Sequence, residues 1–118
     1  MKSLLLLLAA FLLTGSAYAQ DPFDKAKQAL VLRDTSTAIT QFKEALKVGR
    51  KASESNYYLG AIALARHHAD EAVGYFQAAI DRDAENVEAL GQLGYALLEK
   101  KDNAGALAQF RRAGKLAR

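Results

Sequence analysis

The chain has 118 residues and a formal net charge of +3 at pH 7, and 51% of its residues are hydrophobic, which is ordinary for one small globular domain. It contains no cysteine, which excludes disulfides, thiolate metal ligands and a cysteine nucleophile. Alanine is abundant while valine and isoleucine are few, and because a sheet core needs β-branched side chains, this balance favours an all-α fold.

The first predicted element is a cleavable signal peptide over residues 1–19. A basic start is followed by an apolar run over residues 4–13, and Ala17 and Ala19 provide the small side chains that a signal peptidase reads. Ten helical residues rise only about 15 Å, half of a hydrocarbon core, so a membrane span is disfavoured, with an uncleaved anchor as the alternative. Because the mature domain, residues 20–118, would be exported without disulfides, we expect a bacterial periplasm, with secretion as the alternative.

Six helices are predicted after the signal peptide. Asp21 followed by Pro22 is typical of a helix start, because it places an N-cap before a proline at the first helical position. Asp34 and Asp102 take equivalent positions before later helices, where a carboxylate caps free N–H groups, and His68 replaces them in the middle copy. The predicted helices cover residues 22–33, 36–48, 53–66, 70–82, 87–100 and 103–117.

Residues of the same type recur at a spacing of 34. The clearest columns are Ala38, Ala72 and Ala106, then Phe42, Phe76 and Phe110, and then Ala45, Ala79 and Ala113, while Leu59-Gly60 recurs as Leu93-Gly94. On a helix, the alanine, phenylalanine and alanine of one copy form a stripe against which a paired helix packs closely. The spacing therefore predicts three helix–turn–helix units, near residues 19–52, 53–86 and 87–118.

The pattern of L-G followed by A-x₃-F-x₂-A over 34 residues resembles the tetratricopeptide repeat (TPR) family. The resemblance covers the mature chain and implies a right-handed superhelix, whose first helices line a concave face that holds a peptide or a partner protein. One subclass clamps an acidic peptide C-terminus with basic residues. The corresponding positions here carry Phe23, Lys27, Tyr58, Glu88 and Gln92, and because Lys27 is the only cation among them, this mode is disfavoured.

The concave face implied by the resemblance supplies the predicted partner-binding residues. Tyr57, Tyr58 and Tyr95 would act as apolar anchors, because tyrosine combines a large contact area with a hydroxyl group at low entropic cost. The alternative is that these rings merely pack between helices. The polar groups expected to orient a partner are Lys27, Glu54, Glu88 and Gln92.

The last predicted helix has a basic face opposite Phe110. That face consists of Arg111, Arg112, Lys115 and Arg118. It is either the solvated surface of an end repeat or a second contact, with anionic lipid headgroups or an acidic partner. Nucleic acid is not an expected partner, because export removes it. No seventh, capping helix is predicted, so the apolar stripe of the last pair is expected either to stay exposed or to dock on another copy or a partner.

The sequence offers little for catalysis. His67-His68 with Asp70 and Glu71 is the only group of metal-ligand residue types, and adjacent helical positions point about 100° apart, so the imidazoles would not converge. Nucleophile-elbow, phosphate-binding and dinucleotide motifs are absent. We therefore expect no enzymatic activity, metal or cofactor, and predict an exported scaffold that binds a protein. The alternatives are a self-associating subunit of an envelope assembly, and peripheral contact with an anionic membrane through the basic helix.

Overall fold

The structure, a computed structural model, describes residues 21–118, so the predicted signal peptide lies outside the described residues. This part of the chain contains six α-helices and no strand. The helices are α2 (Pro22–Val31), α3 (Thr35–Lys47), α4 (Ala52–Ala65), α5 (Ala69–Arg82), α6 (Val87–Glu99) and α7 (Asn103–Leu116). Every predicted helix is present, with ends within two residues of the prediction. None of these helices has the length and hydropathy needed to cross a bilayer.

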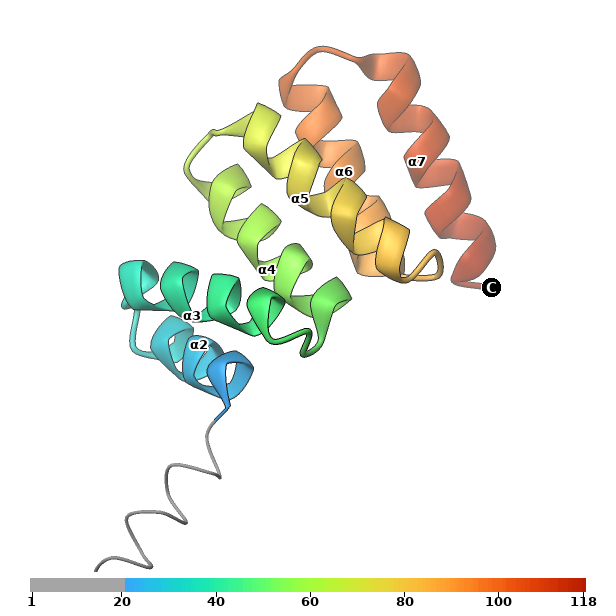
Figure 1. Cartoon of the computed structure of the whole chain (residues 1–118). Helices are drawn as coiled ribbons and strands as arrows, with labels where there is room; N and C mark the ends of the chain where they lie inside the picture. Colours follow the sequence, from blue (N-terminus) through green and yellow to red (C-terminus); the bar gives the residue numbers. More distant parts are fainter. Residues whose placement is uncertain (1–20) are drawn as a thin grey trace, which may run out of the picture.

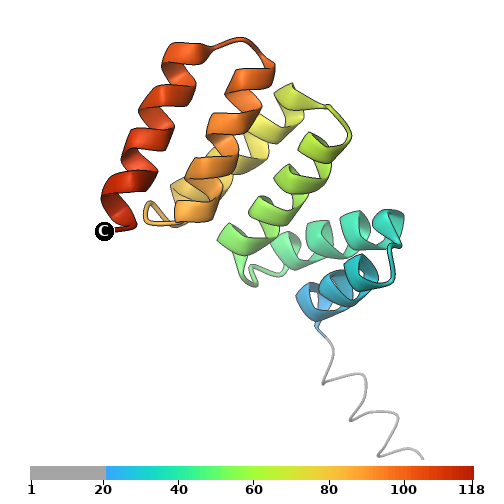
Figure 2. The same cartoon turned by 180° about the vertical axis from the view of Figure 1, so that it is seen from behind.

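The helices form three antiparallel hairpins that stack along the chain (Figure 1). Within hairpins, α2 packs on α3, α4 on α5 and α6 on α7, and between hairpins α3 packs on α4 and α5 on α6. The view from behind shows the same order, with the α2–α3 hairpin at one end and α7 at the other (Figure 2). Since α4 also touches α6, the first helices of neighbouring repeats share one side of the stack. The predicted all-α repeat fold is confirmed.

Capping residues begin most of the helices where the sequence predicts them. The carboxylate of Asp21 accepts a hydrogen bond from the backbone N–H of Asp24 at 2.9 Å, and Asp34 and Asp102 each accept one from the residue three positions later. His68 makes no side-chain cap bond at the start of α5. Asn86 caps α6 by accepting from the N–H of Ala89 at 3.0 Å, a cap that the sequence analysis missed.

The turn inside each hairpin contains a residue in the left-handed conformation. Arg33, His67 and Lys101 have φ of 60°, 60° and 65° and lie 34 residues apart. In the first turn, the N–H of Arg33 donates to the carbonyl of Leu30 and the N–H of Asp34 donates to that of Ala29. This is the Schellman arrangement, which usually places glycine at the left-handed position. The same two bonds recur in the other two turns, so the repeat extends to the backbone hydrogen bonds.

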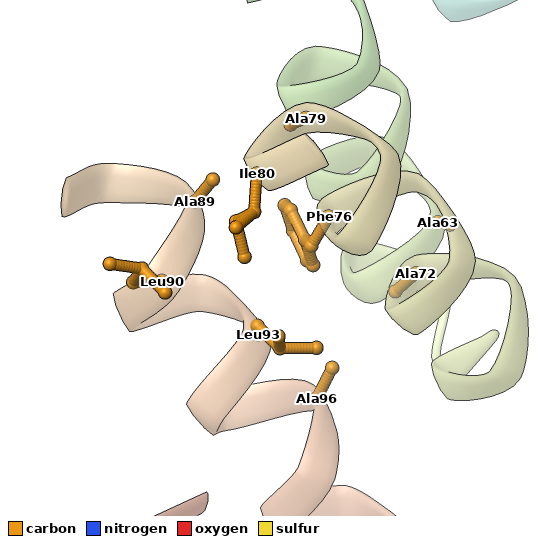
Figure 3. Packing of buried hydrophobic residues seen from close by; sticks show 9 residues of the cluster. All are labelled: Ala63, Ala72, Phe76, Ala79, Ile80, Ala89, Leu90, Leu93 and Ala96. Carbon is orange, nitrogen blue, oxygen red and sulfur yellow. The ribbon is translucent and has the colours of Figure 1, made fainter. Parts of the chain in front are cut away.

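The core is divided into two clusters that meet at α4. The first joins α2 and α3 to Leu59 of α4, and the second runs from α4 through α5 to α6. Phe42 and Phe76, one in each cluster, have no exposed surface. Figure 3 shows Phe76 and Ile80 of α5 pointing toward Leu93 and Ala89 of α6. The spacing predicts phenylalanine between the paired helices of one hairpin, and Phe76 also contacts the next hairpin through α6 (Figure 3).

Glycines in the first helices make room for these phenylalanine rings. A Cβ atom on Gly60 would lie 2.7 Å from the ring of Phe76, and one on Gly94 would lie 2.5 Å from the ring of Phe110. Real Cβ atoms do not approach carbon atoms so closely. The Leu-Gly pair of the repeat is thus explained by packing rather than by a turn or a ligand.

Candidate protein-binding groove

One surface depression gathers four of the side chains predicted to bind a partner. It has a volume of about 460 Å³ and is bordered by the start of α4, the loop between α5 and α6, and the first turn of α6. Its lining residues are Glu54, Tyr57, Tyr58, Asp83, Glu85, Asn86 and Glu88. We call this depression the tyrosine–carboxylate pocket. It lies between the first helices of adjacent repeats, where the sequence analysis expected a groove.

The two tyrosine rings in this pocket are half-buried. The rings of Tyr57 and Tyr58 meet edge to face, with centroids 5.3 Å apart and an interplanar angle of 72°. Tyr58 stacks on Phe42 with centroids 5.0 Å apart, and Tyr57 tilts against Phe76 at 6.1 Å. Each ring therefore packs against the core on one side and lines the pocket with the rest, and its role as an anchor for a partner stays a prediction.

The charged groups that line the pocket are all negative. Glu54, Asp83, Glu85 and Glu88 contribute carboxylates, and no lysine or arginine lines the depression. Burial raises the pKa of the Tyr57 hydroxyl, and the neighbouring Tyr58 and Glu88 raise it further. The phenol of Tyr57 is therefore neutral at pH 7 and remains a hydrogen-bond donor beside the carboxylates.

A hydrogen-bond chain holds the loop that closes the pocket. The side-chain amide of Asn86 donates to the hydroxyl of Ser53 at 3.0 Å, and that hydroxyl donates to the carbonyl of Ala79 at 2.8 Å. Ser53 is buried, so this chain is protected from water. Because α4, α5 and α6 each supply one partner, it fixes the loop against both hairpins.

A second, more apolar depression lies on the other side of Tyr58. Its volume is about 330 Å³, and it lies between α4 and the turn that joins α2 to α3. We call it the apolar pocket; its lining residues are Leu30, Thr35, Tyr58, Ala61, Ile62, Ala65 and Arg66. Tyr58 thus separates two neighbouring pockets of different chemistry along α4.

Three predicted site residues lie outside both pockets. Lys27 on α2 has its ammonium group 5.7 Å from the ring centroid of Phe23. Gln92 is half-buried on α6. Tyr95 is 56% exposed, and its ring meets that of Phe110 edge to face at 5.2 Å. The three predicted tyrosines therefore do not converge on a single pocket: two share one, and the third stands apart on the next repeat.

The basic residues of the last helix are all exposed. Arg111, Arg112, Lys115 and Arg118 form no ion pair with any described residue. Leu107 and Leu116 of α7 are also exposed, at 48% and 40%, and because they are nine residues apart they point to opposite sides of the helix. Gly114 occupies in α7 the repeat position that the buried Ile80 occupies in α5. At this position α7 therefore presents less apolar surface than α5 does.

The two histidines have separate partners. The Nδ1 atom of His67 lies 3.0 Å from Glu99 at the end of α6, whereas that of His68 lies 3.4 Å from Glu71 on its own helix. No group of three potential metal ligands occurs within residues 21–118. His67 therefore links two repeats, whereas His68 pairs with the first turn of α5.

Comparison with known proteins agrees with the repeat geometry. The family model described as tetratricopeptide repeat matches residues 23–76 and 62–117, which together span nearly the whole described chain. A search of curated proteins gave no match. The chain therefore belongs to the tetratricopeptide repeat family, whose repeats generally mediate protein–protein interaction.

Proposed function

We propose that the protein is an exported, non-enzymatic scaffold that binds a peptide or a partner protein on the side formed by α2, α4 and α6. The observation that carries this proposal is the pair of pockets along α4, with two fixed tyrosine rings at their junction. Rigid aromatic side chains that expose part of their surface are typical of binding hot spots.

The test blocks the groove with a side chain that the wild type lacks. Gly91 occupies in α6 the repeat position that Tyr57 occupies in α4, and nothing lies within 4 Å of a Cβ added there. Gly91→Gln therefore adds a side chain to the proposed binding side, and its Cβ atom meets no neighbouring atom. Gly74→Gln is the matched control, since Gly74 is an equally open glycine on the second helix α5.

Cross-linking followed by pull-down from the native envelope measures the effect. We expect Gly91→Gln and Tyr57→Ala to lose a partner that the wild type and Gly74→Gln retain, with circular dichroism confirming that each variant is folded. If the groove variants capture the same proteins as the control, this side of the molecule is not the binding side.

Export is a separate part of the proposal. It rests on the residue pattern of positions 1–19 and on the absence of cysteine, which suits a bacterial periplasm. The intact mass of the full chain expressed in a bacterial host measures it. A mature protein that begins at Gln20 in the periplasmic fraction is the expected result, and a cytoplasmic protein that retains residues 1–19 would contradict it.

Self-association is the second candidate function, favoured by the exposure of Leu107 on α7. Light scattering distinguishes the two. A stable dimer or larger assembly that Leu107→Glu dissociates supports self-association, whereas a monomer that loses its partner through Gly91→Gln supports the groove.

A further inference from the structure

The carboxylates of the tyrosine–carboxylate pocket form no ion pair with another described residue. Five ion pairs occur among the described residues, and none of them involves Glu54, Glu85 or Glu88. Asp83 accepts a hydrogen bond from the backbone N–H of Glu85. The basic end of α7 lies beside the loop between α5 and α6 (Figures 1 and 2), yet none of its cations reaches ion-pair distance of these acids. The pocket therefore carries a local negative field that attracts a cation from outside.

The walls of the pocket suit a cation that is carried on an apolar stem. Lysine and arginine pack their methylene groups on apolar surface while the charged head contacts carboxylates, and their heads also favour the faces of aromatic rings. The chain uses this contact on the ring of Phe23, where the ammonium groups of Lys27 and Lys51 lie 5.7 Å and 4.8 Å from the ring centroid, and Lys51 is the one that starts α4. That lysine is thereby directed to α2 and does not line the pocket.

The pocket is already fixed in shape. The bonds that join Asn86, Ser53 and Ala79 hold its loop, and the core contacts of Tyr57 and Tyr58 hold its rings. A site that is ordered before binding loses less conformational entropy when a ligand arrives. Binding of a single side chain there is therefore favoured over rearrangement of the loop around a large surface.

We propose that the tyrosine–carboxylate pocket receives a lysine or arginine side chain from an extended segment of the partner, while the neighbouring apolar pocket receives an apolar side chain of the same segment. Charge complementarity selects the first residue, and the lining by Leu30, Ala61 and Ile62 selects the second. This inference rests on the proposed function and adds the chemistry of the partner: a basic segment with an apolar residue close to its cation.

The test measures the binding of defined peptides to the full chain as purified. The probes are fluorescent ten-residue peptides that carry one leucine and one arginine at each of several spacings, with matched sets in which the arginine is replaced by citrulline or glutamate. Fluorescence anisotropy at low salt is expected to show tightest binding for arginine at one preferred spacing. Citrulline, which keeps the shape and loses the charge, should weaken binding about tenfold.

Two double variants each remove two negative charges, one inside the pocket and the other, as the control, outside it. Glu54→Gln with Glu88→Gln removes two charges from the pocket, and Glu44→Gln with Asp81→Asn removes two from exposed positions on α3 and α5. We expect the first pair to weaken arginine-peptide binding about tenfold, to abolish the preference over citrulline and to leave the unfolding temperature unchanged. The second pair should bind as the wild type does.

The outcomes separate this inference from the proposed function. If the peptides bind without preferring arginine, and Gly91→Gln weakens that binding, the cation site is wrong and the groove proposal stands. If no peptide binds, and Gly91→Gln captures the same partner as the wild type, the proposal that this groove binds a partner is wrong. If the wild type is a dimer that both Glu54→Gln/Glu88→Gln and Arg111→Gln/Arg112→Gln dissociate, the cation belongs to a second copy and the peptide proposal fails.

Discussion

Replacement of Arg33 by glycine is expected to stabilise the protein. Arg33 and Lys101 have φ of 60° and 65°, are exposed, and donate the backbone bonds of their turns through N–H groups that glycine keeps. The left-handed conformation costs a residue with a Cβ atom about 1–2 kcal/mol, and glycine avoids this cost. Against this, the greater conformational freedom of glycine stabilises the unfolded chain by roughly 0.5–1 kcal/mol.

The two effects oppose each other and leave a net gain. We expect about 0.5–1 kcal/mol for each turn, and about twice that for Arg33→Gly combined with Lys101→Gly, because the turns lie in different hairpins. For a domain of this size, 1 kcal/mol corresponds to roughly 4–8 °C in Tm, so each single variant should melt about 2–8 °C higher. Thermal unfolding followed by circular dichroism at 222 nm measures this shift.

The matched control makes the same exchange in a different conformation. Arg112 is also an exposed arginine but lies in the interior of α7, where glycine costs about 1 kcal/mol relative to good helix formers. Arg112→Gly should therefore lower the Tm while Arg33→Gly raises it. If both substitutions lower the Tm by similar amounts, the left-handed turn carries no recoverable strain and the reasoning is refuted.

Two further predictions concern packing and pH. Gly60→Ala brings a Cβ atom against the ring of Phe76 and should lower the unfolding free energy by about 1–3 kcal/mol. In Gly74→Ala the added Cβ atom meets nothing within 4 Å, so this variant should raise the unfolding free energy by about 0.5–1 kcal/mol. Equal effects of the two variants in urea unfolding would contradict the packing account. Hydrogen bonds from Thr37 hold the pKa of Asp34 below its usual value, so its contribution is fully present above the unfolded pKa near 4 and is lost as the pH falls through the lower folded value. Urea midpoints measured between pH 2 and 5 should show this loss in the wild type and a smaller one in Asp34→Asn.

The repeat columns were sufficient to predict the helices and most of the core. Alanine and phenylalanine at offsets of four and three define a helical face whatever the neighbouring sequence, so Phe42 and Phe76 could be assigned to the interior before the fold was known. The caps at Asp21 and Asp34 were equally readable, because short polar side chains at helix starts have one main local role.

The turns inside the hairpins were not predictable from local preference. Arginine and lysine carry no signal for positive φ, so nothing in Arg33 or Lys101 alone points to the left-handed conformation, and the modest preference of histidine is too weak to predict it for His67. Their common spacing of 34 residues shows that they occupy one repeat position, but it does not give the conformation of that position. The end of the first helix in each hairpin imposes the conformation, since the turn must satisfy the same two carbonyl groups of that helix.

The candidate site was predicted in part. Repeat position identified the helix face, and this was enough to bring together Tyr57 and Glu88, which lie on adjacent first helices. The contributions of the loop, Asp83 and Glu85, were missed because helix periodicity says nothing about a connection between hairpins. Tyr95 was grouped with the other tyrosines, but a position on a helix face does not give the distance between repeats along the stack.

The division of the core at α4 gives the two pockets different mechanical surroundings. The tyrosine–carboxylate pocket is built mainly on the α4–α5 and α6–α7 hairpins, which the second core cluster ties together. The apolar pocket spans the seam where the α2–α3 hairpin meets α4, and the first cluster crosses that seam through Leu59, Tyr58 and Ile62 of α4. We therefore expect substitutions at the interface between α3 and α4 to alter the apolar pocket more than the tyrosine–carboxylate pocket, most of whose lining lies on the other two hairpins.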